Sequence, residues 1–186
     1  MIETLLNIPP AFILIIGALL LPILPGRLKN WVAILLPALA FIIISQLKVG
    51  TIVTQHFFSY DLILVRVDKL SKAFGYIFTL SATVAFIYGY YEKKATEFVS
   101  ALFYIGSALG VVFAGDLFTL YLYWEIMAIA STFLILARKT SSAMAASKRY
   151  IMVHIFGGLV LLAGILVTVN HTGSLAFNSF TEVNIG

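Results

Sequence analysis

The chain has 186 residues, of which 61% are hydrophobic and 11% charged, with a net charge of +4. A soluble domain carries about 45–50% apolar and about 25% charged residues, so this composition indicates an integral membrane protein embedded in a lipid bilayer. The absence of cysteine excludes a disulfide framework and iron–sulfur ligation, and neither a metal site nor a cofactor is expected. The basic residues lie at the ends of apolar segments, which indicates membrane topology and not nucleic-acid binding.

Six apolar segments are each near the 17–25 residues that a helix needs to cross a bilayer. They predict an all-α integral membrane protein with six transmembrane helices in a single domain over residues 1–186. The predicted spans are about 8–24, 31–47, 70–91, 98–114, 117–137 and 150–169. The N-terminus lacks a basic region and a small-residue cleavage site, so the first segment is expected to be a retained helix.

Residues 48–67 have a different pattern. Short β-branched and aromatic runs, Thr51–Thr54 and Leu62–Val67, flank a turn sequence at Ser59-Tyr-Asp. This pattern predicts a short external β-hairpin between the second and third helices. Asp68 is expected to cap the third helix, and Asp116 the fifth.

The distribution of Lys and Arg predicts the orientation. With an external N-terminus, the inner side carries eight basic residues and the outer side four: Arg27, Lys29, Lys93, Lys94, Arg138, Lys139, Lys148 and Arg149 against Lys48, Arg66, Lys69 and Lys72. Because basic residues accumulate on the cytoplasmic side, both termini are predicted outside a multi-pass cell (inner, cytoplasmic) membrane.

Glu125 lies in the middle of the fifth apolar segment. At about 1.5 Å per helical residue, it is about 13 Å beyond Asp116 and about 20 Å before Arg138. A carboxyl near the centre of a hydrocarbon core costs at least about 2.5–3.5 kcal/mol on insertion scales, so it indicates a proton or ion path. The alternative is a protonated acid that hydrogen-bonds a neighbouring helix.

Helical spacing puts Tyr121, Glu125, Ala128 and Thr132 on one face of this segment. Tyr121 could donate to the carboxylate, and Thr132 could hold a water on the same side. The alternative for Thr132 and the adjacent Ser131 is that their hydroxyls bond backbone carbonyls, which is common in membrane helices.

His154 lies about one turn inside the sixth segment. Histidine titrates near neutral pH, so it could pass protons toward Glu125. The alternative is a hydrogen-bonded structural histidine. The ion-translocation site predicted from the sequence therefore consists of Glu125, Tyr121, Thr132 and His154, with Glu125 as its central group, and no catalytic residues are assigned.

Glycines on two segments predict close helix packing. Gly106 and Gly110 form a G-x-x-x-G pattern, and Gly157, Gly158 and Gly164 lie on the last segment. Small residues let helices approach closely, so the last three segments are expected to pack together with Glu125 facing the bundle.

A basic partner for Glu125 is absent from the apolar middle of all six segments. A buried charge without a partner is costly. Either Glu125 is neutral at rest, or its partner belongs to another chain.

The sequence from Ala114 to Ile135 resembles the fifth helix of the antiporter-like subunits of respiratory complex I. It is equally similar to the large subunits of Mrp-type cation/proton antiporters and of membrane-bound hydrogenases. The specific part is the aromatic-Trp-Glu core at Trp124 and Glu125. Lys148-Arg-Tyr150 resembles the start of that family's sixth helix, and Val67–Ser71 the start of its third, with Lys69 in place of the usual glycine.

The resemblance implies a function for the chain. In that family the acid matching Glu125 pairs with a lysine on a seventh, interrupted helix, which has no counterpart among these 186 residues. The chain is therefore expected to be an ion-translocating subunit, carrying protons or sodium, without redox chemistry of its own. It is expected to be a split or truncated version that needs other membrane subunits, one of them supplying a mid-membrane lysine.

Two alternatives stay open at this stage. One is a non-conducting structural spacer subunit of such a complex. The other is an independent six-helix transporter, although no second copy of the acid-bearing helix is present, as an inverted repeat would require. The sequence distinguishes neither proton from sodium nor hydrogenase from quinone reductase or antiporter.

Overall fold

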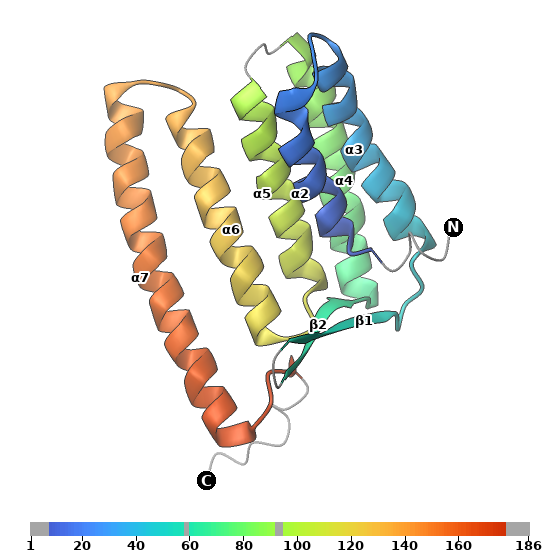
Figure 1. Ribbon diagram of the computed structural model, residues 1–186, viewed down its shortest axis with the longest axis vertical. Helices are drawn as coiled ribbons and strands as arrows, with labels where there is room; N and C mark the ends of the chain where they lie inside the picture. Colours follow the sequence, from blue (N-terminus) through green and yellow to red (C-terminus); the bar gives the residue numbers. More distant parts are fainter. Residues whose placement is uncertain (1–7, 58–59, 92–94, 178–186) are drawn as a thin grey trace.

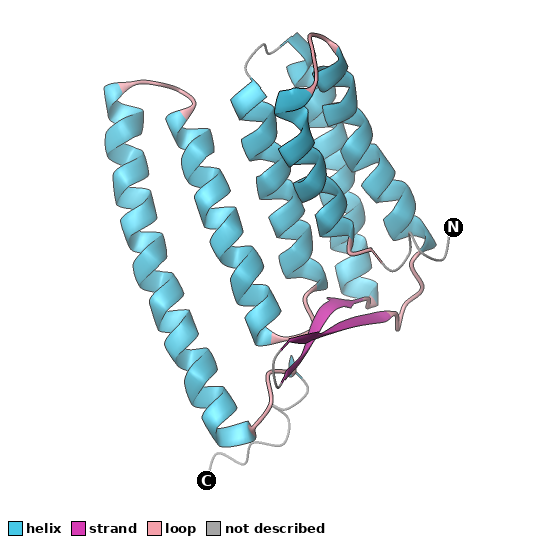
Figure 2. Ribbon diagram, viewed as in Figure 1, coloured by secondary structure: helices cyan, strands magenta, loops and turns pink. Residues whose placement is uncertain are grey.

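The computed structural model describes residues 8–57, 60–91 and 95–177 of the chain. Within them the protein is a bundle of helices with one β-hairpin, which connects α3 and α4 (Figure 2). The elements in chain order are α2 (Pro10–Leu20), the 3-10 turn η1 (Leu21–Ile23), α3 (Leu28–Gln46), β1 (Ile52–Phe57), β2 (Tyr60–Arg66), α4 (Lys69–Tyr88), the 3-10 turn η2 (Gly89–Tyr91), α5 (Ala95–Phe113), α6 (Leu117–Leu136) and α7 (Ser141–Thr172).

Five helices in the described residues are long and apolar enough to cross a membrane, namely α3, α4 extended by η2, α5, α6 and α7. The first apolar segment is also helical, but α2 and η1 together cover only Pro10–Ile23. Pro22 lies in η1 and has no amide hydrogen to continue an α-helix. The first of the six predicted spans therefore forms a shorter helix than expected, and a count of six crossings stays a prediction.

A two-stranded antiparallel hairpin is present, as the sequence pattern predicts, but Tyr60 and Asp61, which were predicted for the turn, belong to strand β2. Its two strands pair antiparallel, with Ile52 opposite Arg66 and Phe57 opposite Tyr60, and the register shifts once, between Val53 and Thr54. Ser59, predicted for the turn, lies outside the described residues. The ribbon crosses one end of the helix bundle, below α5 and α6 in Figure 1.

Side-chain caps define the starts of three helices. Asp68 accepts a hydrogen bond from the Ser71 amide at 2.7 Å, and that donation lowers the pKa of the Asp68 carboxyl. Asp116 caps α6 through the Thr119 amide, so both predicted caps are confirmed. Thr140 caps α7 through Ala143.

The helix α7 is much longer than the span predicted within it. It begins at Ser141, upstream of the expected start at Tyr150, and runs to Thr172, where Gly173 ends it with a φ of 68°. The added turns carry Ser, Ala, Met, Lys and Arg. Alanine, methionine, lysine and arginine favour helix regardless of where an apolar span ends, so hydropathy alone underestimates this helix.

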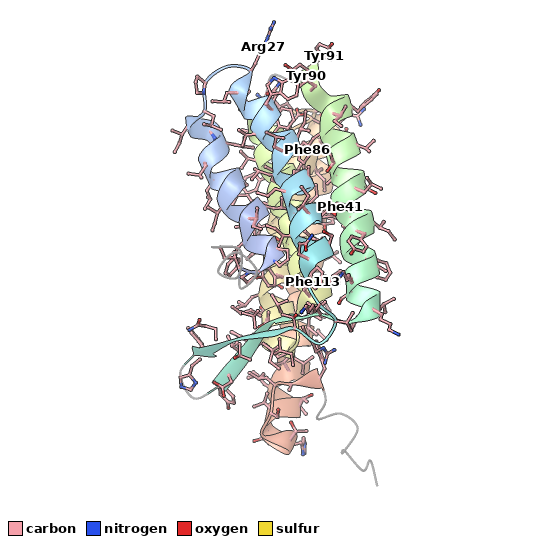
Figure 3. All side chains as sticks on the ribbon, turned by 90° about the vertical axis from the view of Figure 1, so that its right-hand side faces the viewer. Arg27, Phe41, Phe86, Tyr90, Tyr91 and Phe113 are labelled. Atoms are coloured by element: carbon pink, nitrogen blue, oxygen red, sulfur yellow. The ribbon has the colours of Figure 1, made fainter. Side chains whose placement is uncertain are left out.

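The helix α5 is at the centre of the bundle. It packs against α2 on one side and α6 on the other, while α3 packs against α4 and α2. The largest fully buried side chains include Leu14, Ile44, Leu102, Leu109 and Phe113. Phe113 lies toward the hairpin end of the bundle, and Arg27, Tyr90 and Tyr91 lie at the opposite end (Figure 3). The helix α7 has its main contact with α6 and is the outermost element (Figure 1).

The glycines serve different helix pairs. On α5, Gly106 lies against α2, with its Cβ position 3.1 Å from Leu14 Cβ, and Gly110 lies directly against the Tyr123 ring of α6. On α7 only Gly158 approaches another helix, because nothing lies within 4 Å of the Cβ positions of Gly157 and Gly164. The expectation that all three glycines of the last helix serve packing is therefore wrong for two of them.

A junction near the hairpin joins three distant parts of the chain. Asp116 is fully buried, and its Oδ2 accepts hydrogen bonds from the Ile63 amide at 2.6 Å and the Thr119 hydroxyl at 2.7 Å. The Gly115 amide donates to the Ile63 carbonyl, and the Leu117 amide donates to the Leu175 carbonyl. Strand β2, the start of α6 and the segment after α7 are thus held together.

Candidate functional site

Glu125 lies at the interface between α6 and α7. It is the ninth of the 20 residues of α6, near the middle of the helix. Its Oε1 atom is buried and has no hydrogen-bond partner among the described residues. Buried polar atoms are hydrogen-bonded in the great majority of cases, so an unpartnered carboxylate oxygen at this depth requires an explanation.

The carboxyl of Glu125 rests against the backbone of α7 at Gly158. A Cβ at Gly158 would overlap Oε1 of Glu125 and would lie 3.1 Å from its Cδ. Gly158 is one of the few buried residues of α7. Only glycine at this position leaves room for the carboxyl in its observed place.

His154 lies one helical turn from Gly158 and continues the same interface. Its ring centroid is 4.5 Å from that of Tyr150 and 6.2 Å from that of Trp124, the neighbour of Glu125. The Tyr150 hydroxyl is hydrogen-bonded to the Ser131 hydroxyl of α6 at 2.7 Å. We call this set the α6–α7 seam: Trp124, Glu125, Ser131, Tyr150, His154 and Gly158.

The other two predicted site residues are engaged differently. The Thr132 hydroxyl donates to the Ala128 carbonyl at 2.8 Å, and the Ser131 hydroxyl lies 2.9 Å from the same oxygen. The alternative in which these hydroxyls bond backbone carbonyls is therefore confirmed. Tyr121 is half-buried on α6, and no hydrogen bond from it to Glu125 occurs within the described ranges.

Two seam residues, Tyr150 and Gly158, were not identified as neighbours of Glu125 from the sequence, whereas His154 was. Tyr150, His154 and Gly158 follow one another at four-residue spacing, which puts them on one face of α7. That spacing was available as a signal. What the sequence lacked was the rotation of α7 about its axis, which decides that this face meets α6.

The seam contains a carboxyl and an imidazole but no permanent cation. An ion pair of the described residues joins His56 and Asp61 on the exposed hairpin and does not involve Glu125. No group of three His, Asp or Glu residues that could hold a metal ion occurs in the described part of the chain. The arrangement can bind and release a proton or a small cation at Glu125, with His154 as a second titratable group.

Known proteins resemble this chain in sequence and in fold. Residues 114–185 match the family described as NADH:quinone oxidoreductase/Mrp antiporter, transmembrane. The chain is 32% identical over 126 residues to one subunit of the Na(+)/H(+) antiporter of Alkalihalophilus pseudofirmus, a match that covers 63% of this chain and 16% of that protein. It is 29% identical over 174 residues to the corresponding Na(+)/H(+) antiporter protein of Staphylococcus haemolyticus, covering 82% of this chain and 21% of that protein.

Two solved structures share the fold. A chain of an archaeal respiratory complex, the membrane-bound sulfane sulfur reductase, superposes with a TM-score of 0.80 at 19% identity, covering 97% of this chain and 40% of that one. A chain of the Mrp complex of a Dietzia species gives 0.76 at 23% identity, covering 93% and 20%.

The matches agree in sequence and in fold, and the family match includes α6 and α7 with the whole seam. The chain spans about a fifth of the length of the curated relatives described above. The resemblance of the chain to the antiporter-like membrane subunits of the complex I and Mrp family is therefore confirmed.

Proposed function

We propose that this chain is an ion-translocating subunit of a multi-subunit membrane complex and that Glu125 is its ion-binding group. The observation that carries the proposal is the buried, unpartnered Oε1 of Glu125 in the α6–α7 seam. A buried acceptor without a partner costs about 1–3 kcal/mol, and more when it is charged. Such a cost at the middle of an apolar helix is typical of a site that exchanges protons or ions.

The complement of Glu125 is a lysine from outside these 186 residues, supplied at mid-membrane depth by a partner membrane subunit. An opposite charge within about 4–6 Å stabilises the ionised carboxyl, and its withdrawal favours proton uptake. This proposal is supported by the lack of Lys or Arg in the apolar middle of the helices.

The transported ion is a proton or sodium. Relatives of this chain are named as components of Na(+)/H(+) antiporters, and a carboxyl can bind either ion. Because an imidazole can both accept and donate a proton, His154 can relay protons to Glu125 along the seam, and Tyr121 is a donor on the same face of α6. The orientation proposed is N-terminus and C-terminus outside, with the α6–α7 turn inside the cell.

The test is the isosteric variant Glu125→Gln in the assembled complex reconstituted into vesicles. The amide keeps the size of the side chain and removes its titratable charge, so coupled ion transport is expected to fall strongly while assembly of the complex is unchanged. The control is Glu125→Asp, which keeps the carboxyl and is expected to retain part of the transport. Full transport by Glu125→Gln would refute the proposal and favour a non-conducting spacer subunit.

A further inference from the structure

A cavity lies where α6 turns into α7, at the end of the bundle opposite the hairpin. Its volume is about 800 Å³. Besides two alanines of α7, it is lined by Leu134, Ile135, Arg138, Thr140, Ser142 and Arg149. We propose that this cavity binds the phosphate headgroup of an acidic phospholipid.

The charge of the cavity favours an anion. Arg138 follows the end of α6 and Arg149 lies in the third turn of α7, so two separate elements direct guanidinium groups to one space. No carboxylate lines it, and neither arginine has an ion-pair partner in residues 8–57, 60–91 and 95–177. The planar guanidinium matches a phosphate group with two parallel hydrogen bonds, and basic pockets between membrane helices bind acidic headgroups in this way.

Hydroxyl groups complete the polar part of the lining. Thr140 Oγ1 accepts from the Ala143 amide at 3.1 Å and lies 3.2 Å from Ser142 Oγ. One hydroxyl hydrogen of this pair lies between the two oxygens, and the other hydroxyl hydrogen is available to a phosphate oxygen.

The apolar part of the lining favours a lipid over a free phosphate ion. Leu134 and Ile135 precede Arg138 along α6, on the bilayer side of that arginine, and two alanines of α7 complete the apolar lining. A free anion gains nothing from apolar walls, whereas the glycerol and acyl part of a phospholipid buries apolar surface there. Net positive lining charge repels the amine of a zwitterionic headgroup, so acidic lipids are preferred.

Two nearby lysines provide a matched control for the two arginines. Lys139 and Lys148 are adjacent in sequence to the two arginines and carry the same charge, but neither lines the cavity. If these basic residues serve only membrane topology, the two pairs are interchangeable. If the cavity binds a headgroup, the arginine pair alone matters.

The experiment compares Arg138→Gln/Arg149→Gln with Lys139→Gln/Lys148→Gln in the purified complex. Phosphatidylglycerol and phosphatidylcholine retained per complex after detergent exchange are counted by mass spectrometry. The arginine double variant is expected to retain on the order of tenfold less phosphatidylglycerol at this site, because it loses charge-assisted hydrogen bonds. The lysine double variant is expected to retain as much as the wild type, and phosphatidylcholine retention is expected to be low throughout.

Equal loss in both double variants, or no loss in either, overturns the proposal. Displacement of phosphatidylglycerol by millimolar inorganic phosphate also overturns it, by identifying a free-phosphate site. If the arginine double variant does not assemble, Arg138→Lys/Arg149→Lys replaces it in the experiment. This variant keeps both positive charges and removes the planar guanidinium groups that bind phosphate with two parallel hydrogen bonds. Reduced phosphatidylglycerol retention in that variant supports the proposal, and wild-type retention contradicts it.

Discussion

The carboxyl of Glu125 has the backbone of Gly158 as its nearest neighbour on α7. Because Oε1 has no hydrogen-bond partner among the described residues, steric contact holds it in place and no donor does. A carboxyl held this way can reorient toward an incoming cation without first breaking a hydrogen bond. Its position is correspondingly sensitive to any atom added at residue 158.

Gly158→Ala is therefore expected to impair ion transport without changing any titratable group. The new methyl group overlaps the carboxyl, which must rotate away or push α7 outward. Overpacking costs about 1–3 kcal/mol, so transport by the reconstituted complex is expected to fall about tenfold. Gly157→Ala is the matched control, since nothing lies within 4 Å of that Cβ position. Equal rates in the two variants would show that the observed contact does not matter for transport.

The helices α5 and α7 differ in how much of their surface is covered by other helices. The helix α5 packs closely against both α2 and α6 at glycines, whereas α7 contacts mainly α6 and leaves most of its surface exposed. Large side chains cover that outer surface, among them Val153, Phe156 and Leu166. In a membrane, lipid or a neighbouring helix of the complex covers such a face.

Gly110→Ala is expected to destabilise the protein, whereas Gly164→Ala is not. Gly110 lies against the ring of Tyr123, which is only 5% exposed and has little room to move. The added methyl is expected to cost about 1–3 kcal/mol at Gly110. At Gly164 nothing is nearby, and alanine favours helix by up to about 1 kcal/mol over glycine. Thermal unfolding in detergent measures the stability of both variants. A lower unfolding midpoint for Gly164→Ala would contradict the observation that no other helix packs against Gly164.

The positions of helices follow from sequence more directly than their contacts do. Apolar runs, the caps at Asp68 and Asp116, and the β-branched pattern of the hairpin are local signals, and the structure contains each of these elements. The long α7 was underestimated because hydropathy reports where a helix meets lipid, not where its hydrogen bonds begin. The short first helix follows from Pro22, whose effect depends on the turn around it.

The site was predictable only in part, because local sequence signals do not show which helix faces meet. Glu125 stands out because a carboxyl in an apolar run is costly wherever the helix faces. Gly158 does not stand out, because Gly157 beside it is chemically identical and only the rotation of α7 distinguishes them. Tyr150 joins the seam through a bond to Ser131, which is 19 positions away and has no local signature.

The whole molecule has two chemically different ends. The hairpin covers one end, and the basic α6–α7 turn with its cavity is at the other (Figure 1). The seam of Glu125 and His154 lies between them. A molecule built this way presents different surfaces to the two sides of a membrane.

Single-cysteine variants at Ser141 and Thr172 test the proposed orientation. These residues are the two ends of α7, and the chain has no cysteine of its own. Because the turn and the first turns of α7 together carry four basic residues, Ser141→Cys is expected to react only with a reagent that enters the cell. Thr172→Cys is expected to react with an impermeant one. Labelling of both variants from the same side would refute a crossing by α7.

The junction at Asp116 has a consequence for the order in which the protein is made. Ile63 and Asp116 are 53 positions apart, and α4 and α5 lie between them. Likewise, α6 and α7 lie between Leu117 and Leu175, which also meet at the junction. Each helix pair carries the chain across the membrane and back. If one of these helices fails to insert, Asp116 and its partner segment at Ile63 or Leu175 lie on opposite sides of the bilayer, and the junction cannot form. Because Leu175 is synthesised after the rest, closure of the junction is a late, long-range step, and it reports that all four preceding helices have been inserted correctly.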